Sequence, residues 1–403
     1  MHCHVLGLAH SPISTESVRD AFSLKVYNLC RMLRMKGHTV SLYGAAGSDA
    51  SIADDFVECV SAESMERDYG ASDRAQFLFD SGQGWTAQDE AWLEFRQKCG
   101  FELARRVGHK VNEPILLSLG WCHVAMLTGL RMLGACDKAA IIEAGIGYSP
   151  TVAAIRVFES YAWLHYQLGA EVAKKEANGA NPSRTDVVIP NYYDLSHFEF
   201  KAQKKDYALF LGRIVDSKGW GAALEICKKG KMPLKVVGQL PKKDARDIIA
   251  AIEKTGAEYV PSVGLEDRKH LLADARCLIC YTTYVGPFEG VAVEAQLSGT
   301  PVICSDLGAF AETVLHGITG WRIHTIGDGV RALGMLDEIR PEVCREWAES
   351  NYSLEAVAPM YDALLTQVVA GEPVDLRWIA KKYPVIPRTL GASLAEPTAS
   401  GQK

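Results

Sequence analysis

The sequence predicts an α/β protein built from two doubly wound, Rossmann-like domains that face a cleft. First, a length of 403 residues favours two domains, each large enough for its own core. Second, short apolar runs typical of buried strands alternate with amphipathic segments typical of helices. Third, this rhythm stops at the charged stretch 201–206 and restarts at Tyr207. We therefore place one domain at residues 1–198 and the other at residues 199–371.

The first half opens with a strand–helix–strand unit. Residues 2–10 and 39–43 are predicted strands, and the segment between them carries apolar residues at helical spacing, namely Phe22, Val26, Leu29, Leu33 and Met35. The loop before this helix has no G-x-G-x-x-G pattern, so the dinucleotide-binding fingerprint is absent. Further strands are predicted at 55–60, 114–120, 139–143 and 186–190.

Two polar residues stand where strands of the first half end. His123 follows the strand 114–120, and Glu143 ends the strand 139–143. Ligands of open α/β sheets bind outside the carboxyl ends of the strands, so both residues are candidates for catalysis. For His123 a structural role is the alternative, and it is somewhat more frequent for a histidine at such a position. For Glu143 a functional role is favoured, because an unpaired buried carboxylate is costly.

The second half contains the stretch around which the predicted site is organised. Strands are predicted at 207–213, 234–238, 260–264, 275–281 and 302–304. Between the last two, a turn at 286–287 precedes a helix that begins near Glu289 and carries Glu294. Both carboxylates then lie at the mouth of a parallel sheet, and an ionised Glu accepts hydrogen bonds from sugar hydroxyls. For Glu294 alone, the preference for acids near a helix start is an alternative explanation.

The C-terminal region is predicted to leave the second domain. Helices are predicted at 342–350 and 354–369, and residues 372–383 are expected to return to the first domain as a helix. Residues 384–403 are rich in Thr, Ser, Gly and Pro, a composition that predicts disorder.

Composition and charge exclude several classes of protein. A net charge of −6 gives no general attraction to nucleic acid or anionic membranes. No apolar run approaches the roughly 18 residues of a membrane-spanning helix, and the N-terminus lacks a secretory pattern. The 11 cysteines have no metal-finger spacing, and Cys277 and Cys280 lie in an apolar run that predicts buried thiols. We expect a reduced, cytoplasmic protein without a metal.

The stretch beginning at Gly286 resembles the donor-binding signature of retaining glycosyltransferases of the GT-B fold, in particular glycosyltransferase family 4. That signature has a Glu, then Pro-Phe-Gly, then a second Glu eight positions after the first. Pro287, Phe288 and Glu294 match it, and the match continues through 298–303, but Gly286 occupies the slot of the first Glu. The resemblance implies that the second Glu, here Glu294, contacts the ribose of a nucleotide-sugar. The first Glu of the family contacts the donor sugar, a role for which Glu289 is the available carboxylate.

A second similarity involves Arg213 and Lys218, which resemble the family's Gly-Arg…Lys-Gly element. The resemblance implies that both bind the donor diphosphate. Fixed cations suit this role, because negative charge grows on the diphosphate as the glycosidic bond breaks. The implied donor-binding residues are Arg213, Lys218, Gly238, Val263, Gly264, Pro287, Phe288, Glu289, Gly290, Val291 and Glu294. The implied catalytic residues are Arg213, Lys218 and Glu289, with His123 and Glu143 from the first domain.

The first half shows its own similarity. Residues 141–148, followed by 156–165, resemble a block shared by glycosyltransferases of bacteriophages and large DNA viruses. The resemblance places Tyr148 and Arg156 on the acceptor side, together with Ser14 and Thr15, which stand where family members carry a glycine-rich turn. The alternative for 156–165 is an aromatic core helix with an internal Arg–Glu pair.

The resemblance implies transfer of a sugar from a UDP- or GDP-linked donor to an acceptor hydroxyl, with retention and with no other cofactor. The acceptor is a glycan or a hydroxymethylated base in phage DNA. A DNA acceptor would be served by a basic face made of Lys25, Arg31, Arg34, Lys36, Arg105, Arg106 and Lys110. Two rival functions are a nucleotide-sugar epimerase of the same fold and a non-catalytic nucleotide- or sugar-binding module, and the oligomeric state stays open.

Overall fold

The computed structural model describes residues 1–17, 20–70, 86, 88–110, 113–174 and 184–375. The first domain is built on a parallel seven-stranded sheet with the order β3-β2-β1-β4-β5-β6-β7. Its strands are β1 (His2–Leu6), β2 (Thr39–Ala45), β3 (Asp55–Val60), β4 (Ile115–Leu117), β5 (Ile141–Ile146), β6 (Ile155–Phe158) and β7 (Thr185–Val188). Its helices are α1 (Ala21–Met35), α2 (Ala62–Tyr69), α4 (Glu90–Arg106), α5 (Val124–Met132) and α6 (Tyr161–Ala173).

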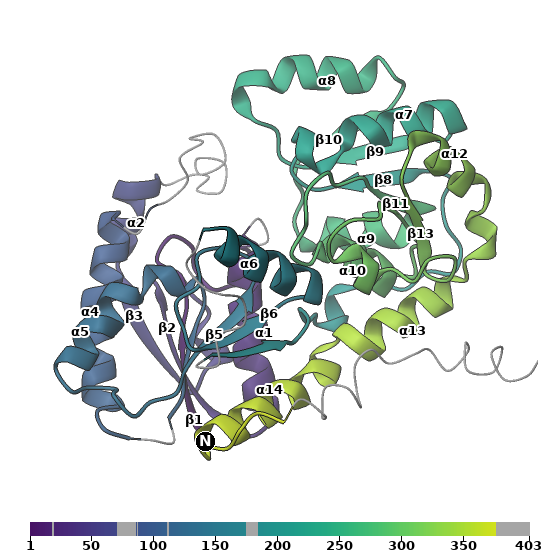
Figure 1. Cartoon of the computed structure of the whole chain (residues 1–403). Helices are drawn as coiled ribbons and strands as arrows, with labels where there is room; N and C mark the ends of the chain where they lie inside the picture. Colours follow the sequence, from purple (N-terminus) through teal and green to yellow (C-terminus); the bar gives the residue numbers. More distant parts are fainter. Residues whose placement is uncertain (18–19, 71–85, 87, 111–112, 175–183, 376–403) are drawn as a thin grey trace, which may run out of the picture.

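The second domain is built on a parallel six-stranded sheet with the order β10-β9-β8-β11-β12-β13. Its strands are β8 (Ala208–Leu211), β9 (Leu234–Val237), β10 (Glu258–Val260), β11 (Cys277–Cys280), β12 (Val302–Ser305) and β13 (Gly320–Ile323). Its helices are α7 (Trp220–Gly230), α8 (Ala245–Glu253), α9 (Leu265–Asp274), α10 (Gly290–Leu297), α11 (Phe310–Thr313) and α12 (Ile326–Gly334). Both sheets run outward in two directions from an inner strand, which confirms the two doubly wound domains (Figure 1).

The last helices return to the first domain earlier than the sequence suggested. α13 (Pro341–Tyr352) packs against α10, whereas α14 (Leu354–Val369) packs against α1 and lies along the first domain (Figure 1). The buried stripe of α14, which includes Val357, Tyr361 and Leu364, joins the core of the first domain. The expected second domain at 199–371 is therefore too long, because the chain returns to the first domain with α14 and not with residues 372–383. Residues 376–403, including the predicted disordered tail at 384–403, lie outside the described part of the chain.

The predicted first helix forms as expected except at its end. Asp20 caps it by accepting hydrogen bonds from the backbone N–H groups of Phe22 and Ser23. Val26, Leu29 and Leu33 of the predicted apolar stripe are buried, but Met35 is 50% exposed. Met35 is the last residue of α1, so the predicted helix includes it although its side chain is not buried.

The stretch 156–165 is a strand followed by a helix, and not one aromatic helix. Ser160 separates β6 from α6 and caps α6 by accepting a hydrogen bond from the N–H of Trp163. Arg156 lies on β6, so its ion pairs connect different elements and are not internal to a helix.

The two cysteines of the Cys-x-x-Cys motif are buried, as the sequence predicted. Cys277 and Cys280 are buried free thiols on β11. Within the described ranges, no helix has the length and apolar character needed to cross a bilayer.

Candidate functional site

A cavity of about 450 Å³ lies between the two domains. The second domain contributes the residues that follow β8, β9, β10 and β11, together with the start of α10 and part of α9. The first domain contributes α1 and residues from the crossover at 191–198. The cavity therefore lies at the carboxyl ends of the second sheet, beside the β8–β11 switch point at which α/β sheets bind ligands.

Lys218 and Glu289 form the central ion pair of the cavity. The Lys218 amine donates to both carboxylate oxygens of Glu289, at 2.9 and 2.7 Å, and lies 5.0 Å from the ring centroid of Tyr284. Burial favours the neutral amine, but the Glu289 charge, Tyr284 and the hydrogen bonds to both side chains together outweigh it and raise the pKa of Lys218. Lys218 is thus held as a cation beside the start of α10.

The position of Lys218 depends on a close contact between two backbones. Gly219 has a φ of +75°, and a Cβ on it would lie 2.6 Å from the carbonyl carbon of Tyr281. Only glycine tolerates both the left-handed conformation and this approach. The loop that carries Lys218 can therefore lie directly against the end of β11.

Glu289 lies close to the residue that replaces the family's first Glu. A Cβ placed on Gly286 would come within 2.6 Å of the Glu289 Cγ and 2.9 Å of its Cδ. Glu289 itself has a left-handed backbone with a φ of 57°, which is costly for a non-glycine residue. Its side chain thus occupies the space that a side chain on residue 286 would enter.

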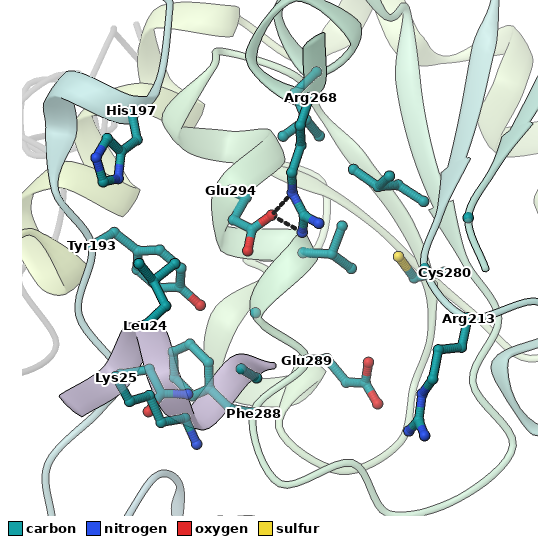
Figure 2. Close-up of a pocket in the computed structure, with 18 of the residues that line it drawn as sticks. Leu24, Lys25, Tyr193, His197, Arg213, Arg268, Cys280, Phe288, Glu289 and Glu294 are labelled. Atoms are coloured by element: carbon teal, nitrogen blue, oxygen red, sulfur yellow. Dashed lines mark hydrogen bonds and ion pairs between the residues drawn. The ribbon is translucent and has the colours of Figure 1, made fainter. Parts of the chain in front are cut away.

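Arg213 approaches the same part of the cavity without a partner. Its side chain is exposed, and none of the described residues forms a hydrogen bond or ion pair with its guanidinium. Figure 2 shows Arg213 and Glu289 reaching into one region of the pocket. An unpartnered cation that lines the same cavity as the fixed Lys218 cation is suitable for binding a diphosphate.

Glu294 lies on α10 and is held by Arg268 of α9. The Arg268 Nε donates to Glu294 Oε2 at 2.8 Å, and its Nη2 donates to the same oxygen (Figure 2). The other carboxylate oxygen has no such bond from Arg268, so it is available to a ligand hydroxyl. Glu294 and Arg268 both line the cavity.

The wall contributed by the first domain contains a second ion pair. Lys25 of α1 pairs with Glu159, and Asn191 donates to the other oxygen of Glu159 at 3.0 Å. Only 17% of the Lys25 side chain and 2% of the Glu159 side chain are exposed. Charged and amide groups on this wall can therefore form hydrogen bonds with a ligand that lies between the two domains.

Two contacts fix the domains on each other next to the cavity. The Ser160 hydroxyl donates to the carbonyl of Pro287 at 2.6 Å. Glu312 of α11 accepts hydrogen bonds from the N–H groups of Tyr161 (3.0 Å) and Ala162 (2.8 Å). A carboxylate of the second domain therefore caps α6 of the first, where the helix dipole favours an anion.

Most predicted donor-side residues meet in this cavity. The described residues that line it include Arg213, Lys218, Gly238, Val263, Pro287, Phe288, Glu289, Gly290, Val291 and Glu294. Gly264 is not among them, although it adjoins Val263 and caps α9.

His123 and Glu143 do not line the cavity, and each has a structural environment. His123 is fully buried between Trp92 and Phe95, and burial lowers its pKa to about 3. Glu143 accepts hydrogen bonds from the Tyr148 hydroxyl and from the N–H groups of Val152 and Ala153, at 2.8, 2.8 and 3.0 Å. Burial raises the pKa of Glu143. Its burial is thus compensated by partners, so the cost of burial no longer argues for a catalytic role.

The predicted acceptor-side residues also lie away from the cavity lining. Tyr148 bridges Glu143 and the N–H of Gly120, and Arg156 is buried between Asp186 and Glu171. Ser14 and Thr15 lie in the loop before α1, outside the described lining residues. The polar residues that line this side include Lys25, Glu159 and Asn191.

The proposed basic face is neutralised. All of its cations are paired with carboxylates: Lys25 with Glu159, Arg31 with Asp194, Arg34 with Asp54, Lys36 with Asp362, Arg105 with Glu102, Arg106 with Glu102 and Asp55, and Lys110 with Glu113. The basic face that a DNA acceptor would use thus consists of cations that each already have a carboxylate partner.

Comparisons with known proteins agree with this architecture. Residues 205–336 match the family model of glycosyl transferases group 1. The crystal structure of AviGT4, a glycosyltransferase involved in avilamycin A biosynthesis, superimposes with a TM-score of 0.64 at 19% identity, covering 92% of this chain and 98% of that one. The chain has the GT-B fold. The crystal structure of Anabaena Alr3699/HepE in complex with UDP-glucose superimposes with a TM-score of 0.54 at 14% identity, covering 91% of this chain and 100% of that one.

Sequence relatives cover a smaller part of the molecule. The D-inositol 3-phosphate glycosyltransferase of Mycobacterium sp. (strain JLS) is 28% identical over 191 residues, which are 42% of this chain and 43% of that protein. The chain spans less than half the length of the curated relatives that it matches. The match to the group 1 family model is confined to residues 205–336, and the structural similarity shows the GT-B fold.

Proposed function

We propose that the protein is a retaining glycosyltransferase that moves a sugar from a nucleoside-diphosphate sugar to an acceptor hydroxyl. The observation that carries this proposal is the convergence of Arg213, Lys218, Glu289 and Glu294 on one cavity between the domains. Two cations and two carboxylates match the four chemical groups of such a donor: two phosphates, a hexose and a ribose.

The diphosphate binds between Arg213 and Lys218. As the bond between the anomeric carbon and the diphosphate oxygen breaks, both cations stabilise the charge that develops on the leaving group. The acceptor oxygen attacks from the same face, and its proton passes to the departing phosphate oxygen. The configuration is therefore retained without a separate pair of acid and base carboxylates.

Glu289 and Glu294 hold the two sugars of the donor. Glu289 accepts hydrogen bonds from hydroxyls of the transferred sugar, because it lies where a side chain on residue 286 would point. Glu294 accepts from the ribose hydroxyls through the oxygen that Arg268 leaves free. The nucleoside is uridine or guanosine, and uridine is favoured by the fold shared with a protein seen in complex with UDP-glucose.

The acceptor binds against the wall made by Lys25, Glu159 and Asn191. These polar groups suit the hydroxyls of a glycan. A hydroxymethylated base in DNA is disfavoured, because each cation of the proposed basic face already has a carboxylate partner and DNA affinity depends on free cations.

A screen of nucleoside-diphosphate sugars for nucleotide release tests the proposal. Release should require one donor and should increase with a glycan acceptor but not with hydroxymethylated DNA. Epimerised sugar formed without acceptor would instead establish the epimerase, and tight nucleotide binding with no turnover of any donor would establish a binding module.

A further inference from the structure

Three potential metal ligands meet at the edge of the first sheet. His2 and His4 lie two residues apart on β1, so their side chains project from the same face of the sheet. The parallel register pairs His4 with Ile115, which places Glu113 beside His2. The two histidines are stacked with ring centroids 4.5 Å apart.

The ligand atoms lie at distances that a single cation bridges. His4 Nε2 is 3.0 Å and His2 Nδ1 is 3.9 Å from the same oxygen, Glu113 Oε2. One nitrogen of each ring and this oxygen all lie within 4.8 Å of one another. Zinc binds histidine nitrogen and carboxylate oxygen at about 2.0–2.2 Å, so ligand atoms around it are separated by roughly 3–3.5 Å.

Each of the three residues also forms a hydrogen bond through its other polar atom, so that the atom facing the other two residues stays available for a cation. His2 Nε2 lies 2.8 Å from Ser41 Oγ, and His4 Nδ1 lies 2.9 Å from Tyr43 Oη. The Lys110 amine donates to Glu113 Oε1 at 2.8 Å, on the side away from the rings. Partners of this kind orient metal-binding histidines and carboxylates.

The access and burial of the cluster fit a cation. His4 is fully buried, whereas 32% of the His2 side chain is exposed, which leaves a path for the ion and room for water. A direct hydrogen bond explains why His4 Nε2 lies close to Glu113 Oε2. It does not explain why His2 also directs a nitrogen towards the same oxygen.

We propose that His2, His4 and Glu113 bind a divalent transition-metal cation, of which Zn²⁺ is the best-suited, with water completing the coordination. Zinc is known to bind through three protein ligands with water in the fourth position, as it does in catalytic sites. The site lies at the amino ends of β1 and β4, whereas the cavity lies between the domains. The ion therefore connects the start of β1 to the segment entering β4, and it takes no part in sugar transfer.

The test is chelator competition with Zn²⁺ on the full-length protein, using His2→Asn and Glu113→Gln. Loss of an outer-shell partner typically weakens metal binding by 10–100-fold, and loss of a ligand should weaken it at least as much. We expect one tight Zn²⁺ per chain in the wild type, at least about tenfold weaker binding in both variants, and an intermediate loss in Ser41→Ala. Added Zn²⁺ should raise the thermal midpoint of the wild type but not that of His2→Asn or Glu113→Gln.

His109→Gln is the matched control, because His109 is an exposed histidine with 76% of its side chain accessible. This variant should bind Zn²⁺ like the wild type. Circular dichroism confirms that each variant is folded. Equal Zn²⁺ affinity in the wild type, His2→Asn and Glu113→Gln would overturn the proposal, as would a wild type that binds no Zn²⁺.

Discussion

The Glu289 side chain lies in the space that a side chain on residue 286 needs, since a Cβ on Gly286 would be 2.6 Å from Glu289 Cγ. The two positions are therefore mutually exclusive sites for a carboxylate. This relationship explains why the signature can lack its first Glu and still place an acid at the start of α10.

A variant with the carboxylate at residue 286 and glycine at residue 289 should have the arrangement of the family signature and should release nucleotide. Gly286→Glu alone should lose nucleotide release, because the new side chain collides with Glu289. Glu289→Gly alone should lose it through the missing acid, although glycine suits the φ of 57°. The double variant Gly286→Glu/Glu289→Gly should exceed both single variants at least about tenfold, because the loss of one stabilising group costs about 10²–10³-fold.

The control for this set is the thermal midpoint, which should show that all three variants are folded. A folded double variant that is no more active than the single variants would show that Glu289 does not act from the place of residue 286.

Glu294→Ala should weaken nucleotide binding through the ribose alone. A hydrogen bond to a charged group contributes about 1.5–3 kcal/mol, which corresponds to roughly 10–150-fold in affinity. UDP should therefore bind that much more weakly to the variant, whereas inorganic pyrophosphate should compete equally well with both proteins. Equal losses for UDP and pyrophosphate would place Glu294 on the diphosphate or on the fold.

His123 should contribute to the pH dependence of stability and not to that of catalysis. Its folded pKa of about 3 lies below the 6.5 of a free histidine, so the unfolded chain binds the extra proton. Its contribution to stability is present above pH 6.5 and is lost as the pH falls towards 3. Between pH 7 and 5 the loss is about 2 kcal/mol.

Urea unfolding at these two pH values measures the effect. The free energy of unfolding should fall less for His123→Leu than for the wild type, and His109→Gln should behave like the wild type. A turnover that depends on a titrating His123 between pH 5 and 7 would contradict this assignment.

Glu312→Ala should weaken the contact between the domains. The variant leaves two backbone N–H groups of α6 without their acceptor, a loss comparable to that of a helix cap, about 0.5–2 kcal/mol. The free energy of unfolding should fall by that amount, and the KM for the donor should rise because Pro287 is held by the same helix start. Glu355→Ala, an exposed acid in the first turn of α14, is the control. Unchanged stability and KM would remove Glu312 from this role.

Local signals in the sequence predicted the fold well. Buried parallel strands such as β11 are continuous apolar runs, and capped amphipathic helices such as α1 have a clear start. The second-domain lining of the cavity was also predictable, because Arg213, Lys218 and Glu294 each follow a strand within a short motif. The return of the chain to the first domain at Ser353 was not predictable. Both α13 and α14 are amphipathic helices, and they differ in the element against which they pack.

The first-domain side was harder to predict, because its interactions join distant positions. Lys25 and Glu159 are 134 residues apart, and nothing in either neighbourhood indicates the pair. Glu143 was interpreted as functional because its hydrogen-bond partners could not be identified from the sequence. Two of them are backbone N–H groups, which no sequence pattern indicates. Arg268 has no local motif, and only its position on α9 brings it to Glu294.

The most direct test of the donor site is calorimetric titration of UDP into the wild type and Arg213→Ala. Arg213 has no partner among the described residues, so its loss leaves the Lys218–Glu289 pair intact, and Arg246→Ala on α8 is a matched exposed control. We predict saturable one-site binding to the wild type and to Arg246→Ala, and at least about tenfold weaker binding to Arg213→Ala, as for a lost charge-assisted hydrogen bond. Equal affinities in all three proteins, or no binding of UDP or GDP to the wild type, would contradict the proposed donor site.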